Sequence, residues 1–570
     1  MQQKRYTISE SSEVNNKEEL TEYSEFVRAL LWRRGIYTSD EAGVFLKPDW
    51  SRDVLDPFLL TDMEKTIERI LRAMKNNEKV TLFSDFDADG IPASVVMHDF
   101  FTKAGFHNFS VVIPHRNTQG FGLNDEVITE CIENGTKLII TIDCGMGDAK
   151  HIVRATESGI EVIVTDHHLP GLEIPKAFAI VNPNQEGDRY PNKHLCGAGV
   201  IFKIVQALVS KNNRLVPTGY EKWLLDMVGI ATLSDMVPLI DENRAIAYYG
   251  LVVLRKSHRV GLKALLSQQR INQRMITEDD VVFSVTPRIN AASRMDAPEL
   301  AFELLSTQDE VRAEALAKHL DSINNERKGV VAQMSKEIRV KVGDEHEESV
   351  LVVGNTHWRP GLLGLAATRA VEVYGKPVFV WGRGESTVIK GSVRGDGKID
   401  VMTLMQETRE LFLEFGGHKH SGGFSITVEN LVKLPEAIND AHARLVKKNE
   451  NPEDPVVVDL ALSLDDVHSR TLAEVSKLSP FGVGNPKPVF VFENITVKGV
   501  EWFGKEKNHI KLLFRAPSGG HVQAIQFFAK GNENFESIQE GQVITLLGSL
   551  ERGQYGRDKG VRLRIVEVVK

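Results

Sequence analysis

Between about residues 76 and 185, short apolar runs alternate with segments whose apolar residues recur at helical spacing. Five of these runs are rich in β-branched or apolar residues and have the length of a strand: residues 79–83, 109–113, 137–142, 161–165 and 178–181. Strands that alternate with helices are typical of a parallel sheet covered on both faces. We therefore predict an α/β fold with a doubly wound, largely parallel sheet.

The rest of the chain is expected to form further regions. Residues 1–17 are polar and are expected to be disordered. Apolar spacing from 299 to about 340 predicts one long helix, and β-like runs after a linker at 451–455 predict a small five-stranded barrel. The predicted regions are an N-terminal helical region (1–75), the first α/β domain (76–295), a connecting helix (296–342), a second, smaller α/β domain (343–448) and the barrel (449–570).

Polar side chains follow the predicted strands of the first domain. The first strand runs into Asp85-Phe86-Asp87-Ala88-Asp89, and later strands end before Arg116, before Asp143 and before Asp166-His167-His168. Because the carboxyl ends of parallel strands meet at one edge, where open α/β sheets bind ligands, we expect these side chains to converge. The aspartate motif alone is equally compatible with a capped turn. Asp235, after an apolar helical segment, is by itself more typical of a helix cap.

Composition is that of an ordinary globular protein, with 42% hydrophobic and 26% charged residues. The three cysteines form no CxxC pair, which argues against a disulfide framework or a zinc–thiolate site. The N-terminus lacks the apolar stretch of a secretory signal and no run has transmembrane length, so we expect a cytoplasmic protein without membrane association. The net charge of −9 still permits a local nucleic-acid groove.

Two segments are candidates for contact with a nucleic acid. The glycine-rich stretch 415–423, which contains His418, permits close approach of a phosphate chain, although a tight solvated turn is the alternative. The hairpin predicted at 552–564 combines basic residues with Tyr555, a pattern that suits single-strand binding. An edge strand protected by charge is the alternative there. The basic residues are Arg552, Arg557, Lys559, Arg562 and Arg564.

Five carboxylates and one imidazole form a candidate set for two divalent cations. Carboxylate-rich ligation suits Mn²⁺ or Mg²⁺ better than zinc, and two such ions about 3.5–4 Å apart promote phosphoryl hydrolysis. Neither a Walker A pattern nor a Gly-x-Gly-x-x-Gly fingerprint follows the first strand. The candidate ligands are Asp85, Asp87, Asp89, Asp143, His167 and Asp235. The side chains available to hold phosphate oxygens are Arg116, His168, Arg288 and Arg394.

In combination these segments resemble the DHH/DHHA1 phosphoesterase superfamily, and within it the RecJ-type single-strand-specific 5′→3′ exonucleases. The likeness covers nearly the whole chain. Four segments resemble the superfamily motifs: Asp85-Phe86-Asp87-Ala88-Asp89-Gly90, Thr141-Ile142-Asp143-Cys144-Gly145, Thr165-Asp166-His167-His168 and Ser234-Asp235. The segments typical of RecJ-type chains are Arg33-Arg34-Gly35-Ile36, Asp56-Pro57-Phe58-Leu59-Leu60, Pro287-Arg288-Ile289-Asn290-Ala291-Ala292 and Pro480-Phe481-Gly482-Val483-Gly484-Asn485-Pro486.

The resemblance implies a DHH domain, a connecting helix, a DHHA1 domain and a C-terminal OB fold. It implies metal binding by the six candidate ligands and places His168 near the scissile phosphate. It further implies recognition of a 5′ phosphate by Arg116, Ser392 and Arg394, assisted by Arg288, and contact of His418 with the nucleic acid. The partners it implies are single-stranded DNA with a 5′ phosphate, together with a helicase and a single-strand-binding protein.

Three segments depart from the family pattern. Trp358-Arg359-Pro360-Gly361 stands where Trp-His-x-Gly is usual, Ser293-Arg294-Met295 where Gly-Arg-Leu is usual, and Ser421-Gly422-Gly423 where Ala-Ala-Gly is usual. These changes fall in the expected substrate groove and leave the metal set intact. They bear on affinity for the strand and on preferred substrate length more than on the reaction itself.

We therefore predict a metal-dependent exonuclease that degrades single-stranded DNA from its 5′ end to mononucleotides, in DNA repair and recombination. Two alternatives remain. A DHH phosphodiesterase or oligoribonuclease that acts on very short nucleotides would share the metal site but would not need the barrel. A catalytically silent single-strand-binding scaffold would have gaps in the ligand set, and all six positions are filled.

Overall fold

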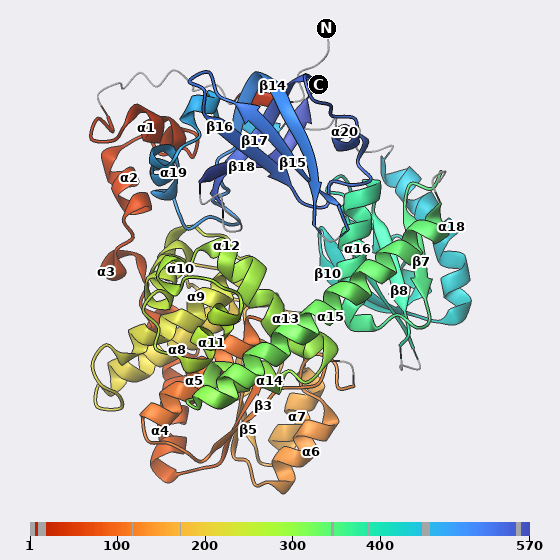
Figure 1. Ribbon diagram of the computed structural model, residues 1–570. Helices are drawn as coiled ribbons and strands as arrows, with labels where there is room; N and C mark the ends of the chain where they lie inside the picture. The colour runs from red at the N-terminus through yellow and green to blue at the C-terminus, as the bar shows by residue number, and fades with distance from the viewer. Residues whose placement is uncertain are drawn as a thin grey trace. The chain divides into compact units, whose positions relative to one another are not determined.

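The computed structural model describes residues 6–8, 19–116, 118–171, 173–343, 347–384, 388–446, 456–504, 506–553 and 560–569. The chain divides into two compact units. One is Asp53–Glu450, and the other combines Met1–Arg52 with Asn451–Lys570 (Figure 1). Among the described residues, no helix has the length and apolar content needed to span a bilayer.

The first sheet of the larger unit is parallel throughout, as predicted. Its strand order is β3-β2-β4-β5-β6, the order of a doubly wound sheet. Ligand sites in such sheets lie at the carboxyl ends of the strands beside the switch point, which here falls between β2 and β4. The strands are β2 (Val80–Ser84), β3 (Phe109–Val112), β4 (Leu138–Ile142), β5 (Glu161–Thr165) and β6 (Ala179–Val181).

Helices cover both faces of this sheet (Figure 1). On one face α5 contacts β2 and β4, while α8 contacts β4 and β5. On the other face α7 contacts β5 and packs beside α6. The central strands β2 and β4 are fully buried, which explains why they are continuous apolar runs, whereas β3 at the edge of the sheet is only partly buried. The helices are α4 (Met63–Asn76), α5 (Gly90–Lys103), α6 (Asp125–Glu133), α7 (Ala149–Glu157) and α8 (Gly197–Lys211).

A further group of helices follows α8, and the last of them leads to the second sheet. The single helix predicted over 299–340 is wrong in one respect, because the chain leaves the helix after Ser306 and starts a new one at Glu310. The side chain of Asp309 accepts a hydrogen bond from Arg312 N (3.0 Å) and so caps the new helix. The helices are α9 (Leu225–Ser234), α10 (Asp241–Leu254), α11 (Val260–Gln268), α12 (Glu278–Asp280), a π-helix (Val281–Val285), α13 (Thr286–Met295), α14 (Glu299–Ser306) and α15 (Glu310–Val342).

The second sheet of the larger unit is mixed, with strand order β10-β11-β9-β8-β7. α15 and α16 cover one face, and α17 and α18 pack on the other. The glycine-rich stretch forms the β10–β11 hairpin, in which Gly416 pairs with Gly423 and Gly417 with Gly422. The elements are β7 (Leu351–Asn355), α16 (Pro360–Tyr374), β8 (Val378–Gly382), β9 (Ile389–Arg394), α17 (Val401–Gln406), β10 (Phe412–His418), β11 (Ser421–Ile426) and α18 (Val428–Val446).

The smaller unit contains the predicted barrel. Five strands close in the order β14-β15-β16-β18-β17, and β17 pairs again with β14. Phe490, Phe492 and Phe514 fill its core. Tyr555, Arg557 and Lys559 of the predicted basic hairpin lie outside the described residues, as does the linker predicted at 451–455. The elements are β13 (Leu460–Ala461), α19 (Ser469–Ser476), β14 (Phe490–Phe503), β15 (His509–Arg515), β16 (His521–Gln526), α20 (Glu533–Glu536), β17 (Val543–Arg552) and β18 (Val561–Val569).

The N-terminal segment belongs to this smaller unit. The expectation of disorder for residues 1–17 is wrong for residues 6–8, which form β1 (Tyr6–Ile8) parallel to β12 (Val456–Val458). The reason is burial of Tyr6, whose ring packs with Val491 and Leu547 of the barrel. The remaining helices of the segment are α1 (Glu25–Trp32), α2 (Ser39–Leu46) and α3 (Trp50–Asp53).

Two of the motifs singled out in the sequence bind each other in this unit. Arg34 Nε donates to Asn485 Oδ1 (2.9 Å), and Arg34 Nη2 donates to Pro486 O (2.9 Å). The preceding Leu30 enters the barrel core. In contrast, α4 packs on α8 and β6 of the larger unit. Residues 1–75 are therefore shared between the two units, and the region boundary predicted at residue 75 stays a prediction.

Candidate metal centre and phosphate-binding residues

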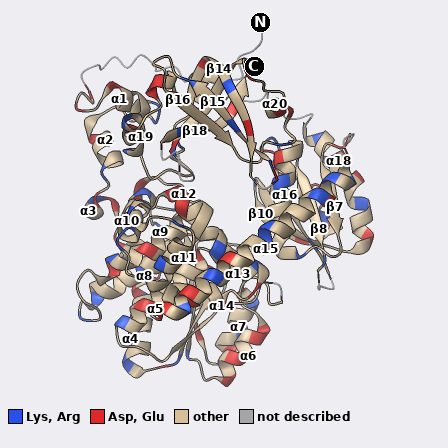
Figure 2. Cartoon of the chain, viewed as in Figure 1, with Lys and Arg blue, Asp and Glu red and all other residues tan. Residues whose placement is uncertain are grey.

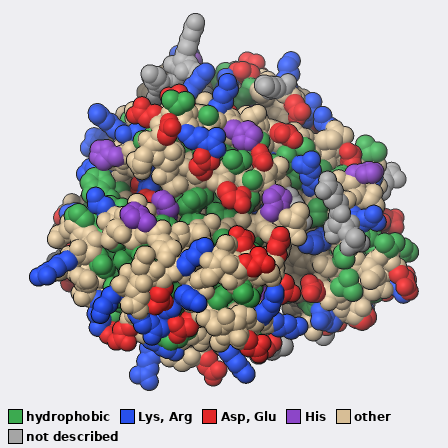
Figure 3. All heavy atoms as spheres, turned by 90° about the horizontal axis from the view of Figure 1, so that it is seen from below, with side chains coloured by type: hydrophobic (Ala, Val, Ile, Leu, Met, Phe, Trp, Pro, Cys, Tyr) green, Lys and Arg blue, Asp and Glu red, His purple; other side chains and the backbone are tan. Residues whose placement is uncertain are grey.

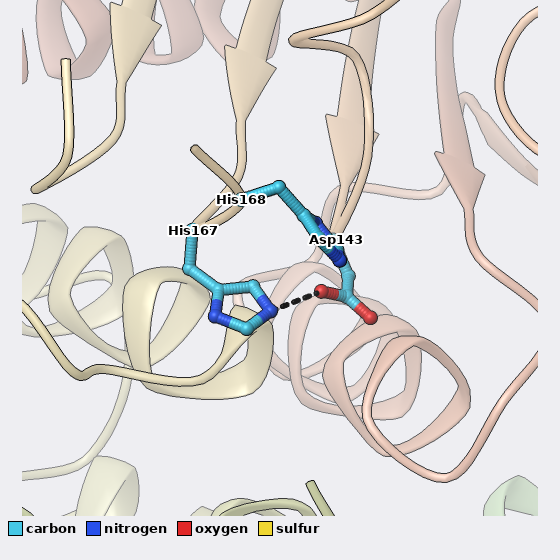
Figure 4. Close-up of side chains that lie close together, drawn as sticks. All are labelled: Asp143, His167 and His168. Atoms are coloured by element: carbon cyan, nitrogen blue, oxygen red, sulfur yellow. Dashed lines mark ion pairs between the residues drawn. The ribbon is translucent and has the colours of Figure 1, made fainter. Parts of the chain in front are cut away.

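Among the described residues, three groups of side chains that could hold a metal ion lie at the carboxyl edge of the first sheet. In each group the potential ligand atoms lie within 4.8 Å of one another. Asp143 and His167 each belong to two groups, so the groups adjoin. Figure 4 shows His167 and Asp143 pointing toward each other from neighbouring strand ends. The groups are Asp85–Asp87–Asp143, Asp89–His167–Asp235 and Asp143–His167–His168.

His167 Nε2 is the central atom of this arrangement. It lies 3.2 Å from Asp143 Oδ1, 3.7 Å from Asp235 Oδ2 and 3.8 Å from Asp89 Oδ2. Burial, followed by the charge of His168, lowers the pKa of His167 to about 4, so its ring is neutral at physiological pH. A neutral imidazole nitrogen facing three carboxylates is a ready metal ligand.

The N-terminus of α8, the helix that follows β6, positions Asp89. Gly197 N and Ala198 N at the start of α8 donate to its two carboxylate oxygens at 2.6 and 2.8 Å. These amides are among those that an isolated helix N-terminus leaves unsatisfied. A Cβ at Gly197 would come within 2.4 Å of Asp143 Oδ1, so only glycine allows the helix to approach this closely. The sequence pattern did not reveal this contribution of α8.

The carboxyl groups are buried close to one another, an arrangement that a bound cation would stabilise. Burial and the charge of Asp87 raise the pKa of Asp89 to about 7, and burial and the charge of Asp89 raise that of Asp235 to about 8. Burial likewise raises the pKa values of Asp85 and Asp143 well above the ordinary range. Within the described residues, Asp85 Oδ1 and Asp143 Oδ1 are buried without a hydrogen-bond donor. Oxygens left in this way suit divalent cations, so the donor set fits the expected metals.

Asp166, which precedes the two histidines in the motif, is a residue of the site that the sequence pattern did not reveal. Its buried carboxylate accepts hydrogen bonds from the backbone N–H groups of His167 (2.7 Å) and His168 (3.0 Å). The same oxygen lies 2.7 Å from His168 Nδ1. Burial opposes the charge on His168, but this hydrogen bond and the negative charges of Asp166, Asp235 and Asp85 together outweigh burial and raise the pKa of His168 to about 9. Asp166 therefore holds the backbone of both histidines and the ring of His168, and it helps to keep His168 protonated.

Arg116 lies beside the aspartate motif. Its guanidinium stands 4.8 Å from the centre of the Phe86 ring. Burial lowers the pKa of Arg116, while the charges of Asp85 and Asp87 oppose that shift. The positively charged guanidinium of Arg116 therefore lies next to the group that contains Asp85 and Asp87.

Arg394 and Ser392 lie on β9, against the first turns of α16. Arg394 Nη1 is 3.4 Å from Ser392 Oγ and donates to Val393 O at 2.8 Å. A Cβ at Gly364 would come within 2.7 Å of Arg394 Nη2, which shows how closely α16 approaches. Across the sheet, Ser421 pairs with Arg394 on one side and with His418 on the other. His418 is exposed at the end of β10 and open to a ligand.

Arg294, which lies in the Ser293-Arg294-Met295 segment that departs from the family pattern, connects these groups. At the end of α13, its Nη1 donates to Gly361 O in the first turn of α16 (2.7 Å). Burial lowers the pKa of Arg294 to about 9, with further contributions from the charges of Arg116, Arg327 and Arg394, while Asp87 opposes them. Figure 2 shows Lys and Arg on α13 and α15. A cluster of poorly compensated cations thus adjoins the carboxylates and would bind an anion.

Arg288, in contrast, already has an anionic partner. Its Nε and Nη2 donate to Asp321 Oδ1 of α15 at 3.2 and 2.9 Å, and its Nη1 donates to Ser284 O. The side chain is buried. This placement favours a role in fixing α13 against α15 over direct contact with a phosphate.

Comparison with known proteins identifies the family. Residues 79–232 match the DHH family N-terminal domain, residues 347–444 the DHHA1 domain and residues 458–567 the RecJ OB domain. The single-stranded-DNA-specific exonuclease RecJ of Bacillus subtilis is 34% identical over 95% of this chain and 67% of its own length. The chain belongs to the RecJ family.

Further RecJ proteins agree with this assignment. RecJ of Haemophilus influenzae is 31% identical over 82% of this chain and 84% of its own length. The crystal structure of RecJ in complex with Mn²⁺ from Thermus thermophilus matches with a TM-score of 0.78 at 25% identity, covering 96% of this chain and 76% of that one. The predicted family and the predicted succession of DHH, DHHA1 and OB folds are confirmed.

Proposed function

We propose that this chain is a metal-dependent exonuclease that degrades single-stranded DNA in the 5′→3′ direction to mononucleotides. The observation that carries the proposal is the convergence of five aspartates and His167 into adjoining groups at one sheet edge. The RecJ relatives are single-stranded-DNA-specific exonucleases, and one of them was crystallised with Mn²⁺. Direction and product follow from the family resemblance.

Two divalent cations, Mn²⁺ or Mg²⁺, would be held by Asp85, Asp87, Asp89, Asp143, His167 and Asp235. Bound there, such ions promote ionisation of water and neutralise charge on phosphate oxygens. The chain itself positions the ligands through Asp166 and the α8 amides. Because Asp166 occupies Nδ1 of His168, the protonated Nε2 of that ring is free to donate a hydrogen bond to an oxygen of the scissile phosphodiester.

The cation cluster would bind the 5′ phosphate. Arg116, Ser392 and Arg394 are the predicted contacts, and we add Arg294 because it ties α13 to α16 beside them. An anion in this position would relieve the repulsion among the arginines. A phosphate anchored at a fixed distance from the carboxylates gives end recognition, which an exonuclease requires. His418, at the exposed end of β10, would contact the strand further along.

The barrel would add affinity for the strand. Its surface carries an aromatic group in which the His509 ring lies 5.1 Å from Phe527 and 5.2 Å from Phe503. The Arg564 guanidinium lies 4.2 Å from the centre of the Phe527 ring. Aromatic rings beside cations are the usual platform for unpaired bases. On the face shown in Figure 3, acidic and basic side chains are interspersed, so we expect the strand to be held by local groups of this kind.

We further propose limits for the domains, two partner proteins and a cellular role. The domain limits are 76–295 for the DHH domain, 296–342 for the connecting segment, 343–448 for the DHHA1 domain and 449–570 for the OB domain, after an N-terminal region at 1–75. A helicase that unwinds duplex and a single-strand-binding protein are the expected partner proteins. The role is in DNA repair and recombination.

The test compares a 5′-phosphorylated strand of several tens of nucleotides, its duplex form and a dinucleotide, each with Mn²⁺, with Mg²⁺ and with a chelator. We expect the long single strand to be degraded to mononucleotides only when a divalent cation is present. Cleavage restricted to the dinucleotide would favour the short-nucleotide phosphodiesterase. Binding without any turnover would favour the silent scaffold.

A further inference from the structure

One backbone segment, residues 193–198, leads into α8 and contacts two of the three ligands in the group Asp89–His167–Asp235. Its last two residues donate the amides that bind Asp89. Figure 4 shows only one ring nitrogen of His167 facing the carboxylate drawn there, while the other points away from it. The His167 ring also hydrogen-bonds to the backbone of Leu195, two residues before the first of those amides. A histidine that binds a metal is usually fixed in this way, through a hydrogen bond from its ring.

Asn184 ties this segment to the backbone of His167. Its side-chain Nδ2 donates to His167 O (2.7 Å) and to Lys193 O (3.1 Å), so both hydrogens of the amide group are used. Asn184 N in turn donates to Asn182 Oδ1 (2.7 Å), and the side chain of Asn182 is fully buried. One amide group therefore connects the residues that follow β5 with the segment that holds the His167 ring.

Asn243 ties the same segment to the loop after Asp235. Its Nδ2 donates to His194 O and to Pro238 O, at 2.5 and 3.1 Å. The side chain is buried, and its Oδ1 accepts a hydrogen bond from Asn192 Nδ2 (2.9 Å), which fixes the orientation of the amide. The three ligands of the group come from three separate parts of the chain, and this one segment connects them.

Asparagine side chains that bind backbone carbonyls also close loops without any role in a functional site. Here, however, the carbonyls belong to His167 itself and to the two residues before Leu195. A shift of this backbone would move the partner of the His167 ring and the amides that bind Asp89 together. The contacts are therefore better explained by positioning of the ligands than by closure of a loop.

We propose that Asn184 and Asn243 are positioning residues that hold His167 and Asp235 at the separation required by a shared divalent cation. The two atoms that face each other across this separation, His167 Nε2 and Asp235 Oδ2, lie 3.7 Å apart. Hydrogen-bond partners of metal ligands typically contribute roughly 10–100-fold to metal affinity. The inference rests on the proposed function for the identity of the site, but it concerns the binding of one cation and can be tested without substrate.

The experiment is calorimetric titration of the full chain with Mn²⁺, without substrate and at one pH. We expect the unaltered chain to bind two ions. Asn184→Ala and Asn243→Ala should each weaken one binding step by roughly 10–100-fold and leave the other within about twofold, because their hydrogen bonds lead to the loops of His167 and Asp235. Asp235→Asn should weaken the same step. When Asn184→Ala is combined with Asp235→Asn, it should add less than about twofold, because both act on one cation.

Two further variants separate positioning of the ligands from general loosening of the fold. Gln185→Ala removes a hydrogen bond of the same loop, from Gln185 Nε2 to Ile180 O (2.7 Å), and should leave both binding steps within about twofold. Asn184→Leu keeps the bulk of the side chain without its donors and should resemble Asn184→Ala. Urea unfolding of the metal-free chain checks that each variant is folded. Unchanged Mn²⁺ affinity in both asparagine variants, equal losses in both binding steps, or an equal loss in Gln185→Ala would overturn the inference.

Degradation of single strands at different Mn²⁺ concentrations gives a second readout. At low Mn²⁺ we expect Asn184→Ala to be far less active than the unaltered chain, and saturating Mn²⁺ should restore kcat to within about twofold. Failure of the proposed function is a different outcome. A chain that binds Mn²⁺ as expected but degrades no strand would contradict the proposed function and still support the inference. A chain that degrades strands while both asparagine variants bind Mn²⁺ normally would overturn the inference alone.

Discussion

His167 Nε2 lies 3.2 Å from Asp143 Oδ1, an oxygen that accepts no hydrogen bond within the described residues. The two residues follow neighbouring parallel strands, in which Ile142 is opposite Thr165. The pair therefore results directly from the strand register. It joins the two groups of carboxylates, because Asp143 also meets Asp85 and Asp87 while His167 also meets Asp89 and Asp235.

Asp143→Ala should abolish metal-dependent degradation. The substitution removes the carboxylate common to two of the ligand groups, and we expect a loss in kcat/KM of roughly 100-fold or more, beyond the effect of changing a residue that only supports a ligand. Binding of single strands should remain measurable, because the barrel is untouched. Turnover assays with Mn²⁺ and fluorescence anisotropy without metal check the two parts. Near-normal turnover would show that Asp143 is not part of the active site.

Arg394→Ala should impair phosphorylated substrates selectively. Under the proposed function the lost interaction would be a charge-assisted hydrogen bond to the 5′ phosphate, for which about 1.5–3 kcal/mol, or roughly 10–100-fold in kcat/KM, is expected. Strands with a 5′ hydroxyl should lose much less. Arg383→Ala, which changes an exposed arginine of the same domain, is the matched control. Equal losses on phosphorylated and hydroxyl-ended strands would rule out end recognition by Arg394.

Gly364→Ala should reproduce that selectivity without removing any charge. The added Cβ would come within 2.7 Å of Arg394 Nη2, so the guanidinium must move. Because the contact involves the end of a flexible side chain, we expect the protein to remain folded. Gly329→Ala, on α15 with nothing within 4 Å of the new Cβ, is the control. Comparison of 5′-phosphate and 5′-hydroxyl strands decides the matter, and an unchanged preference would show that Arg394 is not the recognising group.

Metal binding should release protons, and affinity should rise with pH. The raised pKa values of Asp89 (about 7) and Asp235 (about 8) mean that both carboxyls carry protons at pH 6 in the metal-free chain. A cation must displace these protons, so affinity falls as pH drops from 9 to 6. Calorimetry of Mn²⁺ binding in buffers of different ionisation enthalpy should report at least about two protons released at pH 6 and fewer at pH 9. Proton release that does not vary with pH would contradict these shifts.

The same carboxyls bear on stability. Because their pKa values are higher in the folded than in the unfolded chain, their contribution to stability is fully present below about pH 4 and is lost as pH rises through 7 and 8. Bound Mn²⁺ would offset the loss. The increase in Tm caused by Mn²⁺ should therefore be larger at pH 8.5 than at pH 6, and a larger increase at pH 6 would count against the account.

Lys203→Met should destabilise the larger unit strongly. Lys203 Nζ lies 2.5 Å from Glu242 Oε1 with both side chains buried, and it also donates to Leu55 O (2.8 Å). Loss of one partner leaves a buried charge, at a cost of about 3–5 kcal/mol in the free energy of unfolding. Lys211→Met is the control on the same helix, because its pair with Glu64 is exposed and should contribute less than about 1 kcal/mol. Urea unfolding measures both, and equal effects would contradict the prediction.

The sequence predicted the site best where its residues follow directly after parallel β-strands. Asp85, Asp143 and His167 could be expected to meet because parallel strands deliver their carboxyl ends to one edge, and the structure brings them together. Their role as metal ligands stays a prediction. Asp235 lies at the end of a helix and not of a strand, so its place in the site could be predicted only from the family motif.

Contacts between distant segments could not be predicted from local pattern. The amides of Gly197 and Ala198 that bind Asp89 come from a helix more than a hundred residues further along the chain. Arg294 and Gly361 come together only because α13 meets α16. Likewise, nothing in the local sequence around Arg34 indicates that its partner is Asn485. Backbone donors and long side chains make such links, and neither produces a periodic signal.

The most direct test follows single strands labelled separately at each end through digestion by the full chain with Mn²⁺. If the account is correct, the 5′ label appears at once as a mononucleotide, while the 3′ label stays on a steadily shortening strand, and Asp143→Ala shows neither change. Release of the 3′ label first, internal fragments, or digestion that persists after removal of divalent cations would contradict it.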